Sequence, residues 1–153
     1  MKEFFAGLYE WWGINPLYAT DLGEHLQGLD IICEDYVATP WYTYIGTSMI
    51  LVTLLSYAFQ YHIIDSNRYS GRPHLIITSI TSIVINFLIA FSIPFNALQN
   101  NNYCGELNFN TADCIGFGIS NAIWSFILLV IITSLPWPRS KSVNCSHTIF
   151  WKP

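Results

Sequence analysis

Histidine, cysteine and carboxylate side chains could do acid–base, nucleophilic or metal chemistry. The four histidines, His25, His62, His74 and His147, are scattered along the chain. The long apolar stretches hold no ionisable side chain in their middle, although membrane enzymes and ion-coupled transporters usually place such groups there. The sequence also lacks a paired nucleophile and base, a glycine-rich phosphate loop and a metal-ligand set. We therefore expect a non-enzymatic protein with no catalytic, cofactor-binding or metal-binding residues.

The cysteines offer one candidate crosslink. Cys104 and Cys114 bracket the connection NNYCGELNFNTADC, and an oxidising compartment would allow a disulfide bond between them. The alternative is two free thiols, because sequence spacing does not supply the Cα separation that a disulfide requires. Cys33 adds no metal-ligand spacing to this pair, and Cys145 with His147 would supply too few ligands for a metal site.

Three apolar stretches must position any polar group. Residues 41–64, 75–98 and 115–135 contain no Asp, Glu, Lys or Arg. At about 1.5 Å per residue, a helix over either of the first two spans about 36 Å, enough to cross a hydrocarbon core of about 30 Å. Only 10% of the chain is charged, against roughly 25% in soluble domains. The sequence therefore predicts an all-α membrane protein in which three transmembrane helices form a small bundle, within a domain over residues 41–135.

Residues 1–40 should form an amphipathic, aromatic and acidic helical region. We expect a helix over residues 1–13 that either lies in the lipid headgroup region or packs on protein, which would be the other segments or a partner. Asp21 and Glu24 resemble a capping box, which predicts a second amphipathic helix that extends to Tyr36 before Pro40. Amphipathic aromatic rings favour membrane interfaces. The residues expected to anchor the protein at an interface are Trp11, Trp12, Trp41, Tyr42, Tyr44 and Trp137.

Small and polar residues recur along the second and third apolar stretches. Asn86 lies at the middle of its stretch, and an unpaired carboxamide in hydrocarbon would cost several kcal/mol. These residues should therefore face another helix, in the same or another subunit, or line an aqueous path in an oligomer. The predicted interface or pore-lining set is Thr78, Ser82, Asn86, Ala90, Gly118, Asn121, Ala122 and Ser125.

The distribution of Lys and Arg predicts the orientation. With three crossings, the N-terminal region and the connection over residues 99–114 share one side, where Lys2 is the only such residue. The turn between the first two crossings and the tail over residues 136–153 hold the other five. Because Lys and Arg are retained in the cytoplasm, we expect an outer N-terminus and a cytoplasmic, basic C-terminal tail. We expect an integral membrane protein of a bacterial inner (cytoplasmic) membrane.

Two functions fit these features. The first is a non-enzymatic membrane subunit that oligomerises and anchors or scaffolds a larger assembly, for example a secretion or injection apparatus. The alternative is a pore-forming or channel-type protein, such as a toxin or immune effector, whose uncharged polar stripe lines the path. The expected partners are membrane lipid, further copies of the chain and other membrane-complex proteins. Nucleic acid is not expected, because the sequence has no basic stripe.

Overall fold

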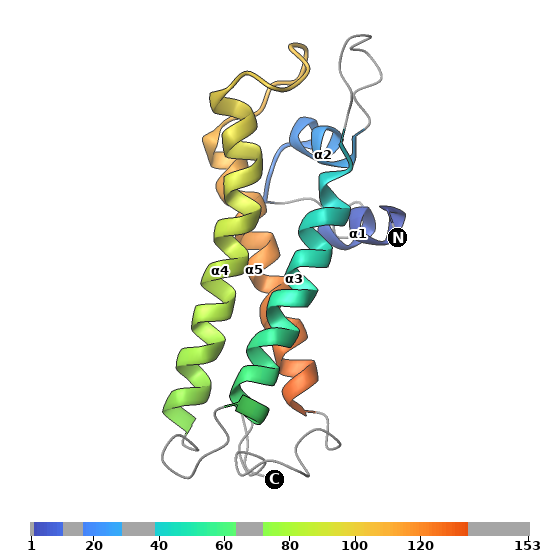
Figure 1. Cartoon of the computed structure of the whole chain (residues 1–153). Coiled ribbons are helices and arrows are strands. Elements are labelled where there is room, and N and C mark those ends of the chain that lie inside the picture. The colour runs from blue at the N-terminus through green and yellow to red at the C-terminus, as the bar shows by residue number, and fades with distance from the viewer. Residues whose placement is uncertain (1, 11–16, 29–38, 64–71, 135–153) are drawn as a thin grey trace.

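The computed structural model describes residues 2–10, 17–28, 39–63 and 72–134. Two short helices, α1 (Lys2–Tyr9) and α2 (Thr20–Gln27), precede the long helices α3 (Trp41–Ala58), α4 (Arg72–Gln99) and α5 (Thr111–Ser134). A π-helical turn, η2 (Phe59–Ile63), continues α3. The long helices stand side by side, with α4 antiparallel to α3 and α5 (Figure 1). We call the end at which α2 lies, where α3 and α5 begin and α4 ends, the α2 end.

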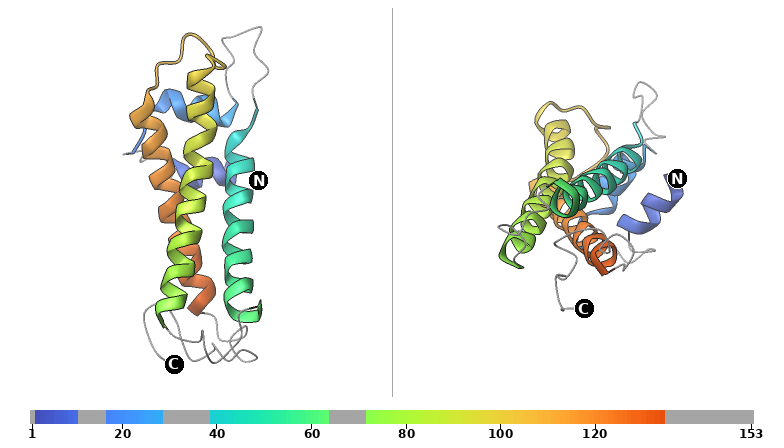
Figure 2. Two further views of the ribbon diagram at one scale, coloured as in Figure 1. Left: turned by 60° about the vertical axis from the view of Figure 1, so that its left-hand side comes forward. Right: turned by 60° about the horizontal axis from the view of Figure 1, so that its bottom comes forward.

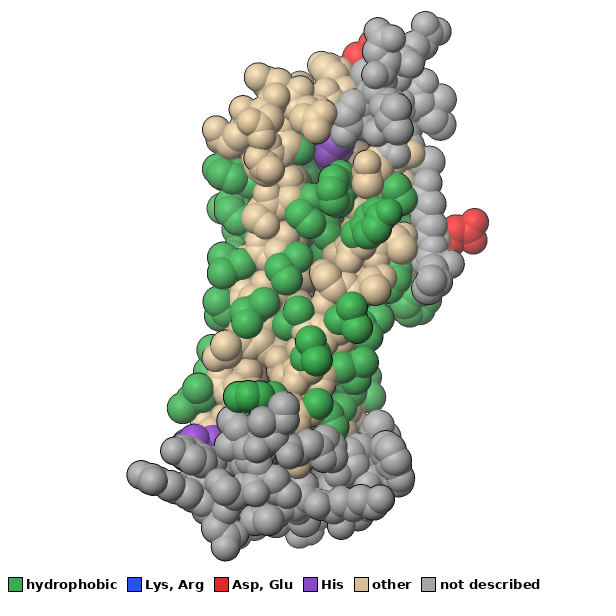
Figure 3. Space-filling model, viewed as in Figure 1, with side chains coloured by type: hydrophobic (Ala, Val, Ile, Leu, Met, Phe, Trp, Pro, Cys, Tyr) green, Lys and Arg blue, Asp and Glu red, His purple; other side chains and the backbone are tan. Residues whose placement is uncertain are grey.

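Three described helices are long and apolar enough to cross a membrane: Trp41–Tyr61, Pro73–Gln99 and Thr111–Ser134. Large apolar side chains on these helices also point outward, for example Leu55, which is 67% exposed, and Ile77, which is 61% exposed. Figure 3 shows such side chains spread over the long helices. Contiguous apolar surface of this kind marks contact with lipid or with other proteins. The predicted all-α membrane fold with three transmembrane helices is therefore confirmed.

The third long helix begins at Thr111, ahead of the predicted Ile115, because a capping box starts it. The side-chain oxygen of Asn110 accepts hydrogen bonds from the backbone N–H of Ala112 (2.7 Å) and Asp113 (3.3 Å). The Asp113 carboxylate accepts the backbone N–H of Asn110 in return, at 2.9 Å. This reciprocal arrangement satisfies N–H groups that a helix start otherwise leaves unpaired.

The predicted capping box at Asp21 is wrong. Helix α2 starts after Ala19, and no side chain caps it. The Asp21 carboxylate instead accepts the backbone N–H of Asn108 at 2.9 Å. The helix is also shorter than predicted, because Gly28 adopts the left-handed conformation (φ 69°) that ends helices.

Helices α1 and α2 cover one flank of the bundle near the α2 end, and α1 lies outside α3 and α5 (Figure 2). Of the two locations considered for α1, the structure therefore places it on the other helices. The close contact depends on Gly46 of α3, where an added Cβ would lie 2.2 Å from the Phe5 ring. Phe5 is only 3% exposed, so α1 buries an aromatic anchor in the bundle.

Gly116 of α5 sets the position of the segment that leads into α2. A Cβ added there would lie 1.7 Å from the backbone carbonyl oxygen of Leu17. Backbone cannot give way as a flexible side chain can, so only glycine permits this approach. One further hydrogen bond holds the same segment, from the backbone N–H of Ala19 to Asp113 at 3.0 Å.

Replacement of Gly116 by alanine should destabilise the protein. In an unobstructed helix the change would favour folding by about 1 kcal/mol, since alanine is the better helix former. Here the clash with Leu17 should reverse the sign and cost about 1–3 kcal/mol. The free energy of unfolding in mixed micelles measures the effect. Gly105→Ala is the matched control, because nothing lies within 4 Å of its added Cβ; a stabilised Gly116→Ala protein would contradict the packing described.

Candidate functional site: a central polar network

A hydrogen-bonded network joins the three long helices where Asn86 lies. The Asn86 carboxamide nitrogen donates to the Ser125 hydroxyl of α5 at 2.7 Å and to the Thr53 hydroxyl of α3 at 3.3 Å. The two hydroxyls also contact each other at 3.3 Å. All three side chains are 0% exposed. The carboxamide therefore faces neighbouring helices rather than lipid or an open path within one chain.

A second branch extends this network to α1. The Asn121 carboxamide nitrogen donates to the backbone carbonyl of Asn86 at 2.8 Å, and the Tyr9 hydroxyl donates to the Asn121 carboxamide oxygen at 2.6 Å. Asn121 and Tyr9 are both 0% exposed. We call Tyr9, Thr53, Asn86, Asn121 and Ser125 the central polar network. It fixes α1, α3, α4 and α5 to one another at the same level.

The other residues of the predicted polar set lie outside the central polar network. Ser82 and Ala90 are buried on α4, and an added Cβ on Gly118 would lie 2.8 Å from the Phe87 ring. Ala122 is half-buried. Thr78 lies away from the network, where its hydroxyl donates to Gln60 of η2 at 2.8 Å. Asn86 Oδ1 and the Ser82 hydroxyl are buried without a hydrogen-bond partner in the described part of the chain. Each of these two groups could therefore take part in one more hydrogen bond.

Removal of the Tyr9 hydroxyl should weaken the fold without loss of packing. Tyr9→Phe leaves the ring in place but deprives the buried Asn121 oxygen of its donor, which should lower the free energy of unfolding by about 1–3 kcal/mol. Denaturation in mixed micelles measures this change. Tyr44→Phe is the control, because Tyr44 is 60% exposed and should tolerate the change. Equal effects of the two substitutions would show that the Tyr9 hydroxyl contributes nothing specific.

A tyrosine cluster lies on the α2 side of the network. The hydroxyls of Tyr18 and Tyr42 are 2.8 Å apart, and the Tyr9 and Tyr42 rings stack with centroids 5.3 Å apart. Burial raises the pKa of Tyr9. Burial also raises the pKa of Tyr18, with a smaller contribution from Glu10. These hydroxyls therefore stay protonated and take part in structural hydrogen bonds, in which Tyr9 is the donor to Asn121.

The prediction of Tyr42 as an interfacial anchor is wrong. Tyr42 is only 1% exposed because α2 packs over it, and Gly23 leaves room for its hydroxyl. Tyr44 is exposed and Trp41 is half-buried, and their rings lie 6.0 Å apart at the start of α3. Trp11, Trp12 and Trp137 lie outside the described residues.

Neither of the two states considered for Cys104 and Cys114, a disulfide bond between them or two free thiols, holds for both cysteines. Cys114 is a free, buried cysteine in the first turn of α5, although Cys104 is itself disulfide-bonded. The early start of α5 explains the difference, because it places Cys114 inside the bundle with the core residue Phe117 instead of in the connection. Cys33 and Cys145 lie outside the described residues.

Substitution of Cys114 should leave the disulfide bond of Cys104 intact. Peptide mapping of the unreduced Cys114→Ser protein should recover Cys104 in a crosslinked peptide, as in the parent protein. Recovery of Cys104 only as a free thiol in this variant would show that the two cysteines pair after all. Cys104→Ser is the control, because it must abolish the crosslinked peptide.

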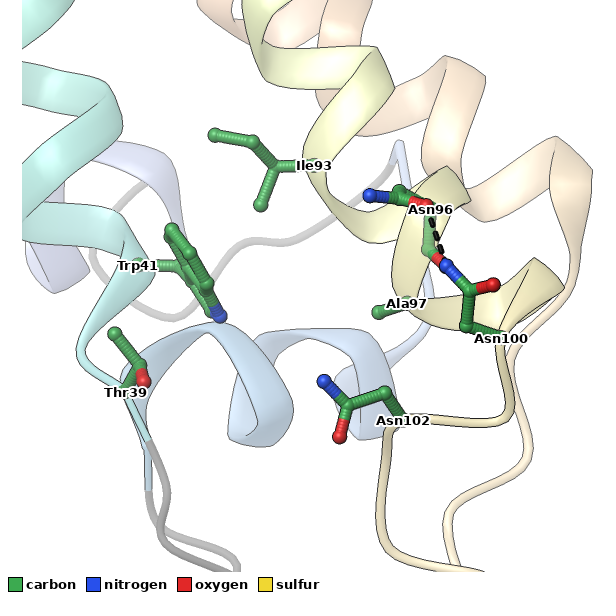
Figure 4. Close-up of a pocket in the computed structure, with 7 residues that line it drawn as sticks. All are labelled: Thr39, Trp41, Ile93, Asn96, Ala97, Asn100 and Asn102. Carbon is green, nitrogen blue, oxygen red and sulfur yellow. Dashed lines mark hydrogen bonds between the residues drawn. The ribbon is translucent and has the colours of Figure 1, made fainter.

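A pocket opens at the α2 end between the start of α3 and the end of α4 (Figure 4). Its volume is about 200 Å³. Three carboxamides, from Asn96, Asn100 and Asn102, line one side, and the Trp41 indole lies opposite them. We call this the asparagine pocket.

Among the described residues, no group of three or more His, Cys, Asp or Glu side chains could hold a metal ion.

Sequence reasoning missed several members of these sites. Thr53 could have been found, because it lies at the middle of the first crossing as Asn86 does in the second, and a short turn places antiparallel helices at equal depth. Asn110 and Asp113 have the spacing of a capping box. No pattern in the sequence indicated that the hydroxyl of Tyr9 would meet Asn121, because that contact depends on how α1 packs.

The fold and the network together define an integral membrane protein made of a helical bundle. The sequence matches the family described as "Tight junction protein, Claudin-like" over residues 3–145, and the chain belongs to this family. The family forms a four-helix membrane bundle, and three candidate spans lie in the described part of this chain. Comparison with curated proteins and with solved structures gives no match.

Membership in this family supports an integral membrane protein with a structural rather than an enzymatic character. It gives no support to the expected bacterial inner membrane, to a secretion or injection apparatus, or to the expected orientation of the termini.

Proposed function

We propose that the protein is a non-enzymatic structural membrane protein that assembles with copies of itself, and with other membrane proteins, at sites of cell–cell contact. The family description, which names a tight junction protein, supports the location. The outward faces of α3, α4 and α5 are apolar, as contact with lipid or with the membrane-embedded part of a neighbouring protein requires.

The observation that carries this proposal is the environment of Asn86. Its carboxamide nitrogen is used by hydroxyls on two other helices of the same chain, and the side chain is 0% exposed. A side chain used in this way holds the helices together and does not face an aqueous path within one chain. This favours the scaffold over the pore-forming alternative, in which the same residues would contact water.

We further propose that the α2 end faces the outside and that the C-terminal tail is cytoplasmic. The excess of Lys and Arg in the turn over residues 65–74 and in the tail supports this orientation. The disulfide bond at Cys104 agrees with it, because disulfides persist in oxidising compartments. The acidic side chains visible in Figure 3 lie at the α2 end and beside α1, which would present an acidic surface to the outside.

Ion leakage from liposomes separates the two functions. Liposomes that contain the purified protein should hold an ion gradient as protein-free liposomes do, because Asn86, Asn121 and Ser125 are buried between the described helices. Asn86→Leu should destabilise the protein but leave leakage unchanged. Leakage that the parent protein causes and Asn86→Leu abolishes would establish the pore instead.

Mixed cultures test the proposed location at contacts. Cells that express a fluorescently tagged chain should concentrate it at borders between two expressing cells, and less at borders with cells that lack it. The Tyr44→Phe variant, which should fold normally, should show the same distribution as the parent chain. A uniform distribution over the plasma membrane, or equal enrichment at both kinds of border, would contradict assembly of facing copies.

A further inference from the structure

Two polar atoms at the centre of the bundle have no hydrogen-bond partner among the described residues. They are the carboxamide oxygen of Asn86, Oδ1, and the hydroxyl oxygen of Ser82. Both side chains are 0% exposed, so neither atom lies on the surface of the bundle. Hydrocarbon supplies no hydrogen bonds, and buried polar groups in folded proteins are normally paired with protein or with ordered water. These two atoms therefore require a partner inside the bundle.

Ser82 and Asn86 lie on the same face of α4, one turn apart. The four residues between them correspond to about 6 Å along the helix axis. The residues one turn along α3 and α5 from the partners of Asn86 are Tyr57 and Leu129, and both are buried. Because α4 is antiparallel to α3 and α5, these residues lie at the level of Ser82 (Figure 1). The Ser82 side chain is therefore enclosed by the same three helices as Asn86.

The Ser82 hydroxyl differs from its neighbours on α4. The hydroxyl of Ser79 donates to the carbonyl of Leu75 at 2.8 Å, and that of Thr81 donates to the carbonyl of Ile77 at 2.9 Å. A bond to the carbonyl four residues earlier is a common way to satisfy a hydroxyl inside a helix. The Ser82 hydroxyl makes no such bond. It is therefore available to a group between the helices.

The unused groups match a small molecule that both donates and accepts hydrogen bonds. Both protons of the Asn86 carboxamide nitrogen are used, by the hydroxyls of Thr53 and Ser125, so Oδ1 remains as an acceptor. The contact between those two hydroxyls uses one of their two protons, and the Ser82 hydroxyl can donate or accept. A water molecule can donate to Oδ1 and accept from Ser82. Buried waters in proteins typically make about three hydrogen bonds of this kind.

The charge of the surroundings favours water over an ion. The oxygens of Asn86 and Ser82 could accept a cation, but an ion at this depth needs an opposite charge to offset its loss of hydration. Within the three candidate spans the only Asp, Glu, Lys or Arg is Asp113, which lies in the first turn of α5. Ser125 follows it by twelve residues, or about 18 Å along the helix. A neutral ligand needs no such charge.

We propose that the centre of the bundle binds one water molecule, held between the carboxamide oxygen of Asn86 and the hydroxyl of Ser82. The water extends the central polar network by one turn along α4, away from the α2 end. It satisfies the two polar atoms that the protein leaves unpaired there. This site is independent of the proposed role at cell contacts, because all of its groups belong to one chain.

A double-mutant cycle on the full chain in mixed micelles tests this proposal. Ser82→Ala should lower the equilibrium constant for folding about fivefold, because the bound water loses a partner. In an Asn86→Leu background the same substitution should leave the constant unchanged or raise it, because the water has lost its acceptor. Ser79→Ala is the matched control. Ser79 is also buried on α4, but it bonds to its own helix, so its effect should be equal in both backgrounds.

Two results of the cycle would overturn the proposal. A Ser82→Ala protein that is as stable as the parent, or more stable, would show that the hydroxyl has no partner to lose. Equal losses from Ser82→Ala in both backgrounds would show that Ser82 and Asn86 share no ligand. The folding constant of the parent should also be the same in sodium, potassium and N-methylglucamine chloride. A loss of stability in N-methylglucamine alone would assign the site to a metal cation instead.

A crystal structure of the parent chain, grown in a lipid phase, gives a direct readout that does not depend on whether Asn86→Leu folds. An ordered water should lie within about 3.2 Å of both Asn86 Oδ1 and Ser82 Oγ. A direct hydrogen bond between these two side chains, or a bond from the Ser82 hydroxyl to the carbonyl of Thr78, would contradict the proposal.

Discussion

Hydrocarbon offers no hydrogen-bond partner to an amide, and this constraint organises the bundle around Asn86. The carboxamide lies in the middle of the second crossing, where the alternatives are a partner helix or a penalty of several kcal/mol. Thr53 and Ser125 supply the partners from the other two long helices. Leucine-rich surfaces associate no more strongly with each other than with lipid tails. These polar contacts therefore stabilise the association of the helices and fix their register.

The short helices and the segment before α2 add further buried hydrogen bonds toward the α2 end. Tyr9 brings a hydroxyl from α1 to Asn121, and Tyr18 brings one to Tyr42. Two carboxylates, Asp21 and Asp113, accept backbone N–H groups from segments far away in the sequence. Glycine at position 116 allows the backbone before α2 to lie directly on α5. Helices α1 and α2 are thus part of the bundle, held by specific hydrogen bonds.

The sequence predicted the three crossings because the length and apolarity of a segment decide whether it can span a bilayer. It also predicted that Asn86, Asn121 and Ser125 belong to one set, since buried amides need partners, although it did not decide between contact and pore. It did not predict that Tyr42 is buried, and it did not decide whether Cys114 is free or disulfide-bonded. Both depend on the packing of α1 and α2 and on the start of α5, and a tyrosine at an interface and a tyrosine under a helix look alike in the sequence.

The exchange rate of the Asn86 side-chain amide protons with water, measured by NMR in lipid nanodiscs, tests the central claim most directly. Helix–helix hydrogen bonds predict slow exchange, with no relaxation enhancement from a water-soluble or a lipid-soluble paramagnetic agent, whereas exposed Asn108 should exchange fast. Fast exchange at Asn86 with enhancement by the water-soluble agent would mean that the stripe lines an aqueous path. Enhancement by the lipid-soluble agent would mean that Asn86 faces lipid, and either result would contradict the account.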